Sequence, residues 1–208
     1  MDASLAVSLQ LPPLLEAAIE AFFTPEHIAA NDIQQHEWEM RSLLKLMLDV
    51  LKPERTVELG TYKGFTAALL SLATSEKTIS LDITDYAKQY ARNLQLFLTD
   101  AAIDGVEQVI GNHLGGPIDL LYIDDGHYYE TIVKEFALWS PMVRSGGWIV
   151  FHDINPLANI GPHGTQPDSI QVPRFWKELN GDKTELIANA QNKYRGHLPH
   201  GGIGILKV

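Results

Sequence analysis

The sequence contains no cysteine. Disulfide bonds, thiolate metal ligands and a cysteine nucleophile are therefore excluded, and the cytoplasm is the expected compartment. Long uninterrupted hydrophobic runs are also missing. The N-terminal segment lacks a basic start and interrupts its apolar run with Pro12, Pro13, Glu16 and Glu20. We therefore expect neither a signal peptide nor a membrane span.

Positive charge is scarce, with 16 Lys and Arg against 26 Asp and Glu, which gives a formal net charge of −10. This balance argues against a nucleic-acid partner and favours a neutral or cationic small molecule. The 208 residues show no internal repeat or low-complexity tract, and their 45% hydrophobic content is enough for one well-buried core. We expect a main domain over residues 36–208, preceded by a helical extension, residues 1–35, that serves as a lid or an oligomer contact.

Short segments rich in β-branched and aromatic residues alternate with helical segments. The predicted strands are 55–59, 77–83, 118–124 and 147–153, and the predicted helices are 14–23, 37–51, 64–74 and 128–143. This alternation predicts a mostly parallel, doubly wound α/β sheet of the Rossmann type. Residues 120–123 form a continuous apolar run, as expected of a strand buried on both faces.

Residues 84–117 allow two arrangements. A helix over 84–101 followed by a strand over 106–110 leaves only residues 111–116 for the crossover to the next strand, which is too short. We therefore predict a helix over 84–92, a strand over 94–99 and a helix over 101–114, although Gly105 disfavours the last helix.

Four prolines fall in residues 154–173, which predicts a lid or binding loop after the fifth strand. A helix over 174–179 and two closing strands, 184–190 and 201–208, follow.

Acidic residues stand at the end of every predicted parallel strand. They are Glu58, Asp82, Asp100, Asp124 with Asp125, and Asp153, which follows His152. One such residue often does no more than cap the next helix. Because ligands of open α/β sheets bind beyond the carboxyl ends of the strands, five such ends together predict a binding site.

The first of these ends continues as "ELGTYKG", residues 58–64. Gly60 and Gly64 allow a ligand to approach the backbone amides, but the pattern is neither GxGxxG nor a Walker loop. A carboxylate before the turn suits an amino group, and Asp82, about 20 residues further on, can accept both hydroxyls of a ribose. The expected ligand is a nucleoside that carries a cation.

Three motifs in order, "TVELGTYKGFTAALLSLA", "ISLDIT" and "DLLYIDDGHYYE…WSPMVRSGGWIVFHD", resemble the class I S-adenosylmethionine-dependent O-methyltransferases. The similarity is greatest to the catechol O-methyltransferase-like branch, with its antibiotic and sugar O-methyltransferases, and it covers roughly residues 34–154. It implies a seven-stranded sheet with an antiparallel last strand. It also implies S-adenosylmethionine as cofactor and a hydroxyl group of a small molecule as the methyl acceptor.

The resemblance also assigns roles to individual residues. Asp82 would hold the ribose, and Asp100 would lie near the adenine. Asp125 is expected to point toward the adenine side or toward the helix that starts near His127. The methionine end would be lined by Glu58, Gly60, Thr61, Tyr62, Gly64 and Thr66.

Asp124 and Asp153 match two acidic ligands of the family's magnesium site, but Ile154 replaces the third ligand, an asparagine. His152 could take that place. A nitrogen ligand would favour manganese, iron or zinc over magnesium, so the expected cation is divalent, with magnesium and manganese both open.

His127 matches the position of the family's catalytic lysine, and with Asp124 it is the expected catalytic pair. A histidine with an ordinary pKa near 6.5 can accept the proton of a hydroxyl at neutral pH. The alternative is that His127 only orients a carboxylate or caps a helix; His152 and His163 are the reserve bases.

Two other functions stay open. One is a non-catalytic regulatory domain that binds S-adenosylmethionine. The other is a metal-dependent hydrolase that uses "DDGH" and "HD" as ligands, which leaves "ELGTYKG" unexplained. The expected partners include neither nucleic acid nor membrane, and a homodimer through the first 35 residues stays open.

Overall fold

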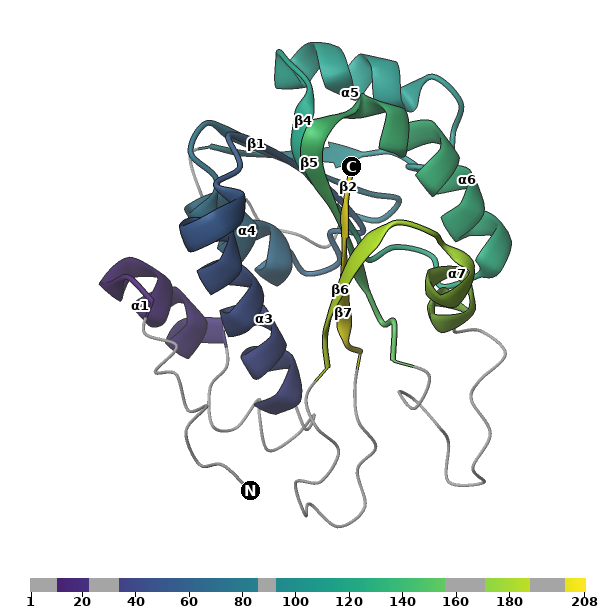
Figure 1. Ribbon diagram of the computed structural model, residues 1–208. Coiled ribbons are helices and arrows are strands. Elements are labelled where there is room, and N and C mark those ends of the chain that lie inside the picture. Colours follow the sequence, from purple (N-terminus) through teal and green to yellow (C-terminus); the bar gives the residue numbers. More distant parts are fainter. Residues whose placement is uncertain (1–10, 23–33, 86–92, 156–170, 188–200) are drawn as a thin grey trace.

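The computed structural model describes residues 11–22, 34–85, 93–155, 171–187 and 201–208. A twisted sheet stands at its centre with helices on both sides (Figure 1). The sheet has seven strands in the order β3-β2-β1-β4-β5-β7-β6. In chain order they are β1 (Arg55–Leu59), β2 (Lys77–Asp82), β3 (Leu94–Leu98), β4 (Ile118–Ile123), β5 (Val143–His152), β6 (Asp182–Leu186) and β7 (Ile203–Lys207).

The first five strands run parallel to one another, whereas β7 lies antiparallel between β5 and β6. The predicted Rossmann-like sheet with an antiparallel last strand is therefore confirmed.

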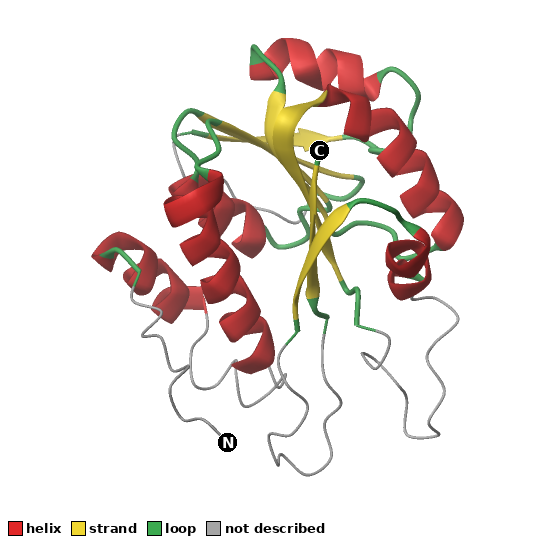
Figure 2. Cartoon of the chain, in the orientation of Figure 1, coloured by secondary structure: helices red, strands yellow, loops and turns green. Residues whose placement is uncertain are grey.

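Helices cover the two faces of the sheet in separate groups (Figure 2). On one side lie α1 (Pro13–Phe22), α3 (Gln34–Leu46) and α4 (Phe65–Ala73), and on the other α5 (Val106–Leu114), α6 (Tyr129–Trp139) and α7 (Val172–Glu178). None of the helices in the described ranges is both long and apolar enough to cross a membrane.

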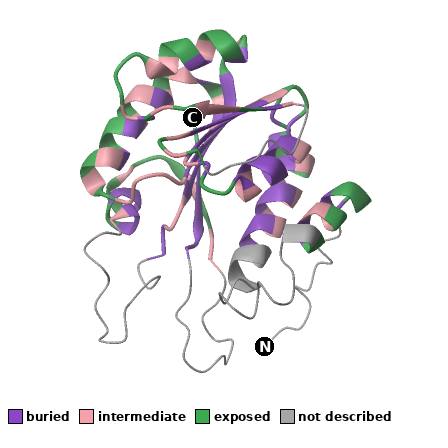
Figure 3. Cartoon of the chain, turned by 180° about the vertical axis from the view of Figure 1, so that it is seen from behind, coloured by how far each residue is buried: buried purple, intermediate pink, exposed green. Residues whose placement is uncertain are grey.

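Each face of the sheet has its own apolar core, visible as buried positions along the strands and the inner helix surfaces (Figure 3). Ile19, Met40 and Leu44 pack with Tyr122 and Val150 on the α3 side. On the α6 side, the buried residues include Leu59, Leu81, Leu121, Ile132, Trp139 and Phe151. Burial of one such side chain contributes about 1.5–3 kcal/mol, so both layers stabilise the strand ends that they flank.

The strand over residues 94–98 confirms the second arrangement predicted for residues 84–117. The helix predicted over 101–114 is wrong at its start, because it begins at Val106. Gly105 stands directly before it with φ 91°, a left-handed conformation that glycine adopts readily and that cannot continue a helix. Residues 86–92 of the helix predicted at 84–92 lie outside the described residues, as do residues 156–170 of the predicted lid.

The helix predicted over 128–143 is also too long. It ends at Trp139 and is followed by a single 3-10 turn, Ser140–Met142, that contains Pro141. Proline has no N–H for the next helical hydrogen bond, so the chain turns, and β5 begins at Val143. The pairing of β5 with β4 shifts register between Ile118 and Leu120, and the regular parallel register resumes at Trp148.

Two further boundaries differ from the prediction. Residues 47–51 form a π-helical turn that ends at Lys52 in the left-handed conformation. β6 begins at Asp182, two residues before the predicted start, and residues 188–190 of that prediction are outside the described part.

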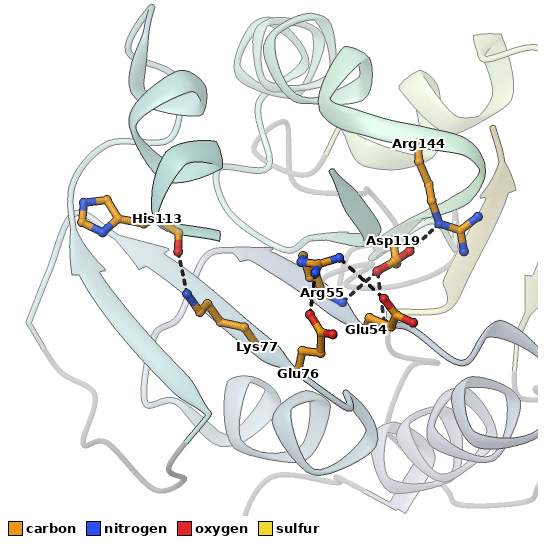
Figure 4. Close-up of polar contacts among 7 residues, drawn as sticks. All are labelled: Glu54, Arg55, Glu76, Lys77, His113, Asp119 and Arg144. Atoms are coloured by element: carbon orange, nitrogen blue, oxygen red, sulfur yellow. Dashed lines mark hydrogen bonds and ion pairs between the residues drawn. The ribbon is translucent and has the colours of Figure 1, made fainter. Parts of the chain in front are cut away.

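A polar cluster fixes the amino ends of the central strands, far from the acidic ends (Figure 4). Asp119 of β4 is buried, and its Oδ2 accepts the backbone N–H groups of Glu54 at 3.1 Å and Arg55 at 2.8 Å. Its other oxygen accepts a hydrogen bond from Arg144 Nε. One carboxylate therefore connects the starts of β1, β4 and β5.

Candidate functional site

The acidic residues predicted at strand ends meet at one edge of the sheet, because β1, β2, β4 and β5 are parallel and in register. The order of strands reverses between β1 and β4, since the chain adds β2 and β3 on one side of β1 and then β4 and β5 on the other. Such a reversal is where open α/β sheets bind ligands.

The turn from β1 to α4 lies directly against the end of β4. Gly60 has φ 93°, and a Cβ atom there would be 2.2 Å from the backbone oxygen of Asp124. No other residue fits at Gly60. Asp124 N–H in turn donates to Leu59 O at 2.9 Å, so the two strand ends are joined through their backbones.

Gly64, with φ 81°, precedes α4, and its N–H donates to Thr61 O at 2.8 Å. The amino end of α4, with Thr66 in its first turn, therefore adjoins the same edge. The N-terminus of a helix carries a partial positive charge.

Asp82 fixes this turn from the neighbouring strand. Its Oδ2 accepts the Tyr62 N–H at 2.6 Å, and its Oδ1 accepts the Thr84 N–H at 2.8 Å. Tyr62 is exposed and left-handed, with φ 45°, which is uncommon for a residue other than glycine. A carboxylate offers about four acceptor positions, so Asp82 still has acceptor capacity for a ligand.

Glu58 is fully buried behind the turn. One of its oxygens accepts a hydrogen bond from Ser80 Oγ, which shares a further hydrogen bond of 2.5 Å with Thr61 Oγ1. The other oxygen, Oε1, has no hydrogen-bond partner within the described chain. Burial raises the pKa of Glu58 well above its ordinary value. A buried acceptor without a donor is costly, and an ammonium group of a ligand would satisfy it.

On the α6 side of the edge, Asp125 meets Glu135, a residue that sequence analysis missed. Glu135 is fully buried, neither of its carboxyl oxygens has a hydrogen-bond partner within the described chain, and the charge of Asp125 acts on it. Burial, together with the charge of Asp125, raises the pKa of Glu135 to about 9. Asp100 is exposed and accepts the Ala102 N–H at 2.7 Å. A proton on Glu135 would remove the repulsion between the Glu135 and Asp125 carboxyl groups.

On the other side of Asp124 lies a cluster with the composition of a metal site. Asp124, His152 and Asp153 each place one ligand atom within 4.8 Å of the others. His152 Nδ1 is 3.2 Å from Asp124 Oδ1 and 3.5 Å from Asp153 Oδ1. Two carboxylates and one imidazole form a donor set that suits a divalent transition metal, so the residues present fit such a group.

His127 stands beside this cluster, with its Nε2 atom 2.6 Å from Asp153 Oδ2. The hydrogen bond to Asp153 raises the pKa of His127. Burial opposes the charged form of His152, but the Asp124 and Asp153 carboxylates outweigh it and raise the pKa of His152 to about 10. In the absence of a cation, a proton on His152 offsets the acidic charge, and a bound cation would displace that proton.

Several residues around the cluster were not predicted. Glu39 of α3 is fully buried, with its Oε2 atom 3.9 Å from His152 Nε2. Burial raises the pKa of Glu39 to about 7. Gln171 binds the loop at His127, because its N–H donates to His127 O at 2.7 Å and its Oε1 accepts the Tyr129 N–H at 2.8 Å.

The sequence held one signal for Glu39: it lies one helical turn before Leu43, on the apolar face of the helix. His163, the other reserve base, lies outside the described residues.

Comparison with known proteins shows similarity to methyltransferases. Residues 57–154 match a family described as "Methyltransferase domain". "Uncharacterized protein y4gI" of Sinorhizobium fredii is 23% identical over 165 residues, which are 67% of this chain but only 16% of that protein. "Probable caffeoyl-CoA O-methyltransferase 3" of Dictyostelium discoideum is 24% identical over 200 residues, which are 85% of this chain and 77% of that protein.

Solved structures share the fold. The O-methyltransferase TomG from Streptomyces achromogenes, in complex with SAM, has a TM-score of 0.62 at 15% identity, over 97% of this chain and 92% of that one. The methyltransferase MycE from the mycinamycin biosynthetic pathway, in complex with Mg and SAH, has a TM-score of 0.53 at 17% identity, over 95% of this chain and 55% of that one.

These comparisons confirm the resemblance found in the sequence: residues 57–154 match a methyltransferase domain, and the chain shares the fold of S-adenosylmethionine-dependent O-methyltransferases.

Proposed function

We propose that this protein transfers a methyl group from S-adenosylmethionine to a hydroxyl group of a small molecule, with help from a divalent cation. The observation that carries the proposal is the position of Asp124. Its backbone packs on Gly60 of the first turn, and its carboxylate joins His152 and Asp153. One residue thus connects the place for a methyl donor with the place for a cation and an acceptor.

S-adenosylmethionine would supply an electrophilic methyl group on its sulfonium. Glu58 Oε1 offers a buried acceptor for the ammonium group, and Asp82 offers acceptors for the ribose hydroxyls. Gly60 and Gly64 add no side chains to the turn between them. Asp125 and the exposed Asp100 would lie on the adenine side.

Asp124, Asp153 and His152 would hold the cation, which would lower the pKa of an acceptor hydroxyl. Neutral His127, beside Asp153, would take the proton of that hydroxyl. Once Asp153 binds a cation, its carboxylate favours the His127 imidazolium less, so the His127 pKa falls toward the value that a base needs at neutral pH. Fixed orientation of donor and acceptor supplies much of the remaining rate enhancement.

The relatives support both parts of the proposal. A caffeoyl-CoA O-methyltransferase by name acts on a small molecule, and MycE was solved with Mg. Asp153 adds support from this chain, because its φ of 61° places a non-glycine residue in the left-handed region. Such strain is concentrated at functional sites.

The test is methyl transfer from S-adenosylmethionine labelled on the methyl group, with a panel of catechols, other phenols and sugars. Each acceptor is assayed with Mg²⁺, with Mn²⁺ and with a chelator. We expect labelled product that depends on the added cation and falls at least 100-fold in Asp124→Asn. Asp104→Asn is the matched control, since the Asp104 side chain is 82% exposed and pairs with Lys134.

Two results would contradict the proposal and favour another function. Tight S-adenosylmethionine binding without product from any acceptor would indicate a regulatory domain. Tight cation binding without S-adenosylmethionine binding would favour a hydrolase.

A further inference from the structure

Glu39 is a buried carboxyl group that the proposed reaction leaves unused. It belongs to α3, outside the matched methyltransferase region, and is fully buried next to Met40. Removing a carboxylate from water costs several kcal/mol unless charges or hydrogen bonds compensate it. The neighbours of Glu39 must therefore compensate the cost of burying its carboxyl group.

The two oxygens of Glu39 face different partners. Oε1 accepts the Gly202 N–H at 3.1 Å. Oε2 has no hydrogen-bond donor among the residues described and lies 3.9 Å from His152 Nε2. The open acceptor position is thus directed at the far side of the imidazole ring.

The His152 ring lies between two sets of acids. Its Nδ1 atom faces Asp124 and Asp153, and its Nε2 atom faces Glu39. Gly201 packs closely against the imidazole from another side. A Cβ atom at position 201 would be 2.7 Å from His152 Nε2 and 3.2 Å from Asp153 Oδ1. This enclosure restricts the ring to one orientation.

We propose that Glu39 is a positioning residue for the cation site: its Oε2 atom, 3.9 Å from His152 Nε2, favours a proton on that nitrogen and moves to hydrogen-bond distance when a cation binds, so that Nδ1, with its lone pair, is presented toward Asp124 and Asp153. The nitrogen that binds a metal is set by the hydrogen bond that the other nitrogen makes. This inference rests on the cation site of the proposed function. It makes α3, which precedes the matched region, part of that site.

Glu39→Gln tests the role with little change in volume. Oε1 of Glu39 accepts the Gly202 N–H and Oε2 faces His152 Nε2, whereas glutamine offers one acceptor and one NH₂ group, so it must set a donor against either Gly202 N–H or the His152 ring. The assay is calorimetric titration of Mn²⁺ and Zn²⁺ into the full chain. We expect affinity to fall about 10–100-fold, the usual effect of losing such a partner. Glu20→Gln, an exposed change on α1, should bind as the wild type does.

The thermal unfolding midpoint of the cation-free protein distinguishes a positioning role of Glu39 from a purely structural one. If Glu39 only supports the fold, Glu39→Gln lowers that midpoint while the Mn²⁺ affinity stays within about twofold of wild type, and the inference is wrong. If the wild type binds neither cation, the cation part of the proposed function fails as well. Methyl transfer that persists in the presence of a chelator would then show that the rest of the function stands.

A second measurement needs no variant and covers the case in which Glu39→Gln does not fold. Nitrogen-15 NMR of the Zn²⁺-loaded wild type identifies which ring nitrogen of His152 carries the proton. A proton on Nε2 and zinc on Nδ1 support the proposal, whereas the opposite tautomer overturns it.

Discussion

At the scale of single residues, Asp153 connects the parts of the candidate site. It lies in the left-handed region, contacts His127 through one oxygen and faces His152 with the other. Asparagine tolerates this backbone conformation nearly as well as aspartate but has no charge. Asp153→Asn therefore separates the electrostatic role of the side chain from its effect on the backbone.

We expect Asp153→Asn to lower the pKa of His127, because the hydrogen bond to Asp153 is the largest cause of its raised value. The measurement is an NMR titration of the His127 ring proton. The thermal midpoint at neutral pH should change little compared with Asp104→Asn. An unchanged His127 pKa would contradict the contact seen here.

Glu135 yields a prediction about pH. Its pKa is about 9 in the folded chain and about 4.5 when unfolded, so between these values the folded state holds a proton that the unfolded state releases. The free energy of unfolding therefore falls as pH rises from about 4.5 to 9. Glu135→Gln, which is always neutral, should remove this loss.

Urea unfolding at several pH values checks this. Glu135→Gln should be more stable than wild type at pH 8, by an amount on the order of a few kcal/mol, and the difference should shrink toward pH 5. Glu130→Gln, at an exposed position of the same helix, provides the control. Stability curves for Glu135→Gln and wild type that stay parallel over this range would show that Glu135 is ionised in the folded protein.

The acidic residues at strand ends could be predicted from sequence because a parallel sheet brings all its carboxyl ends to one edge. Glu39 could not, because its contact with Gly202 joins residues 163 positions apart. The sequence showed that Glu39 lies on an apolar helix face but not which strand that face covers. Glu135 was missed for the same reason, since its importance depends on a carboxyl neighbour from a different element.

At the scale of elements, crossover length was the most useful sequence argument. It identified β3, although the strand is short and one other segment, residues 106–110, competed for the place. The end of α6 was placed four residues too late, because the apolar residues Met142 and Val143 follow shortly after Trp139. Pro141 was the available signal. Periodicity alone did not separate the helix from the strand that follows.

The amino ends of the strands provide the element-scale prediction. Asp119→Ala removes the acceptor of two backbone N–H groups and of Arg144, and it should lower the free energy of unfolding by roughly 1.5–3 kcal/mol. The cluster lies at the end of the sheet opposite to the candidate site, so affinity for S-adenosylhomocysteine should stay within about twofold of wild type. Asp104→Ala, at an exposed ion pair, should change stability by less than about 1 kcal/mol.

At the scale of the whole molecule, we expect residues at the amino ends of the strands to determine stability and residues at the carboxyl ends to determine ligand binding. The amino ends hold the sheet together, whereas the carboxyl ends carry buried acids that destabilise the chain when no ligand is bound. Glu58 is the strongest case, because burial raises its pKa and one oxygen has no described partner. Glutamine at this position would remove the cost of burial together with the charge that an ammonium group would meet.

We therefore expect Glu58→Gln to unfold at or above the wild-type temperature without ligand, yet to gain less from S-adenosylhomocysteine. For wild type, ligand at 100 times its Kd should add about 2.7 kcal/mol, which is roughly 5–10 °C for a chain of this size. At the same concentration a 10–100-fold weaker Kd would reduce this gain to about 0.4–1.4 kcal/mol. Asp119→Ala should behave in the opposite way, with a lower starting midpoint and the full gain. Equal gains in wild type and Glu58→Gln would mean that the ligand does not meet the Glu58 carboxyl group, and the cofactor site would then have to lie elsewhere along the edge.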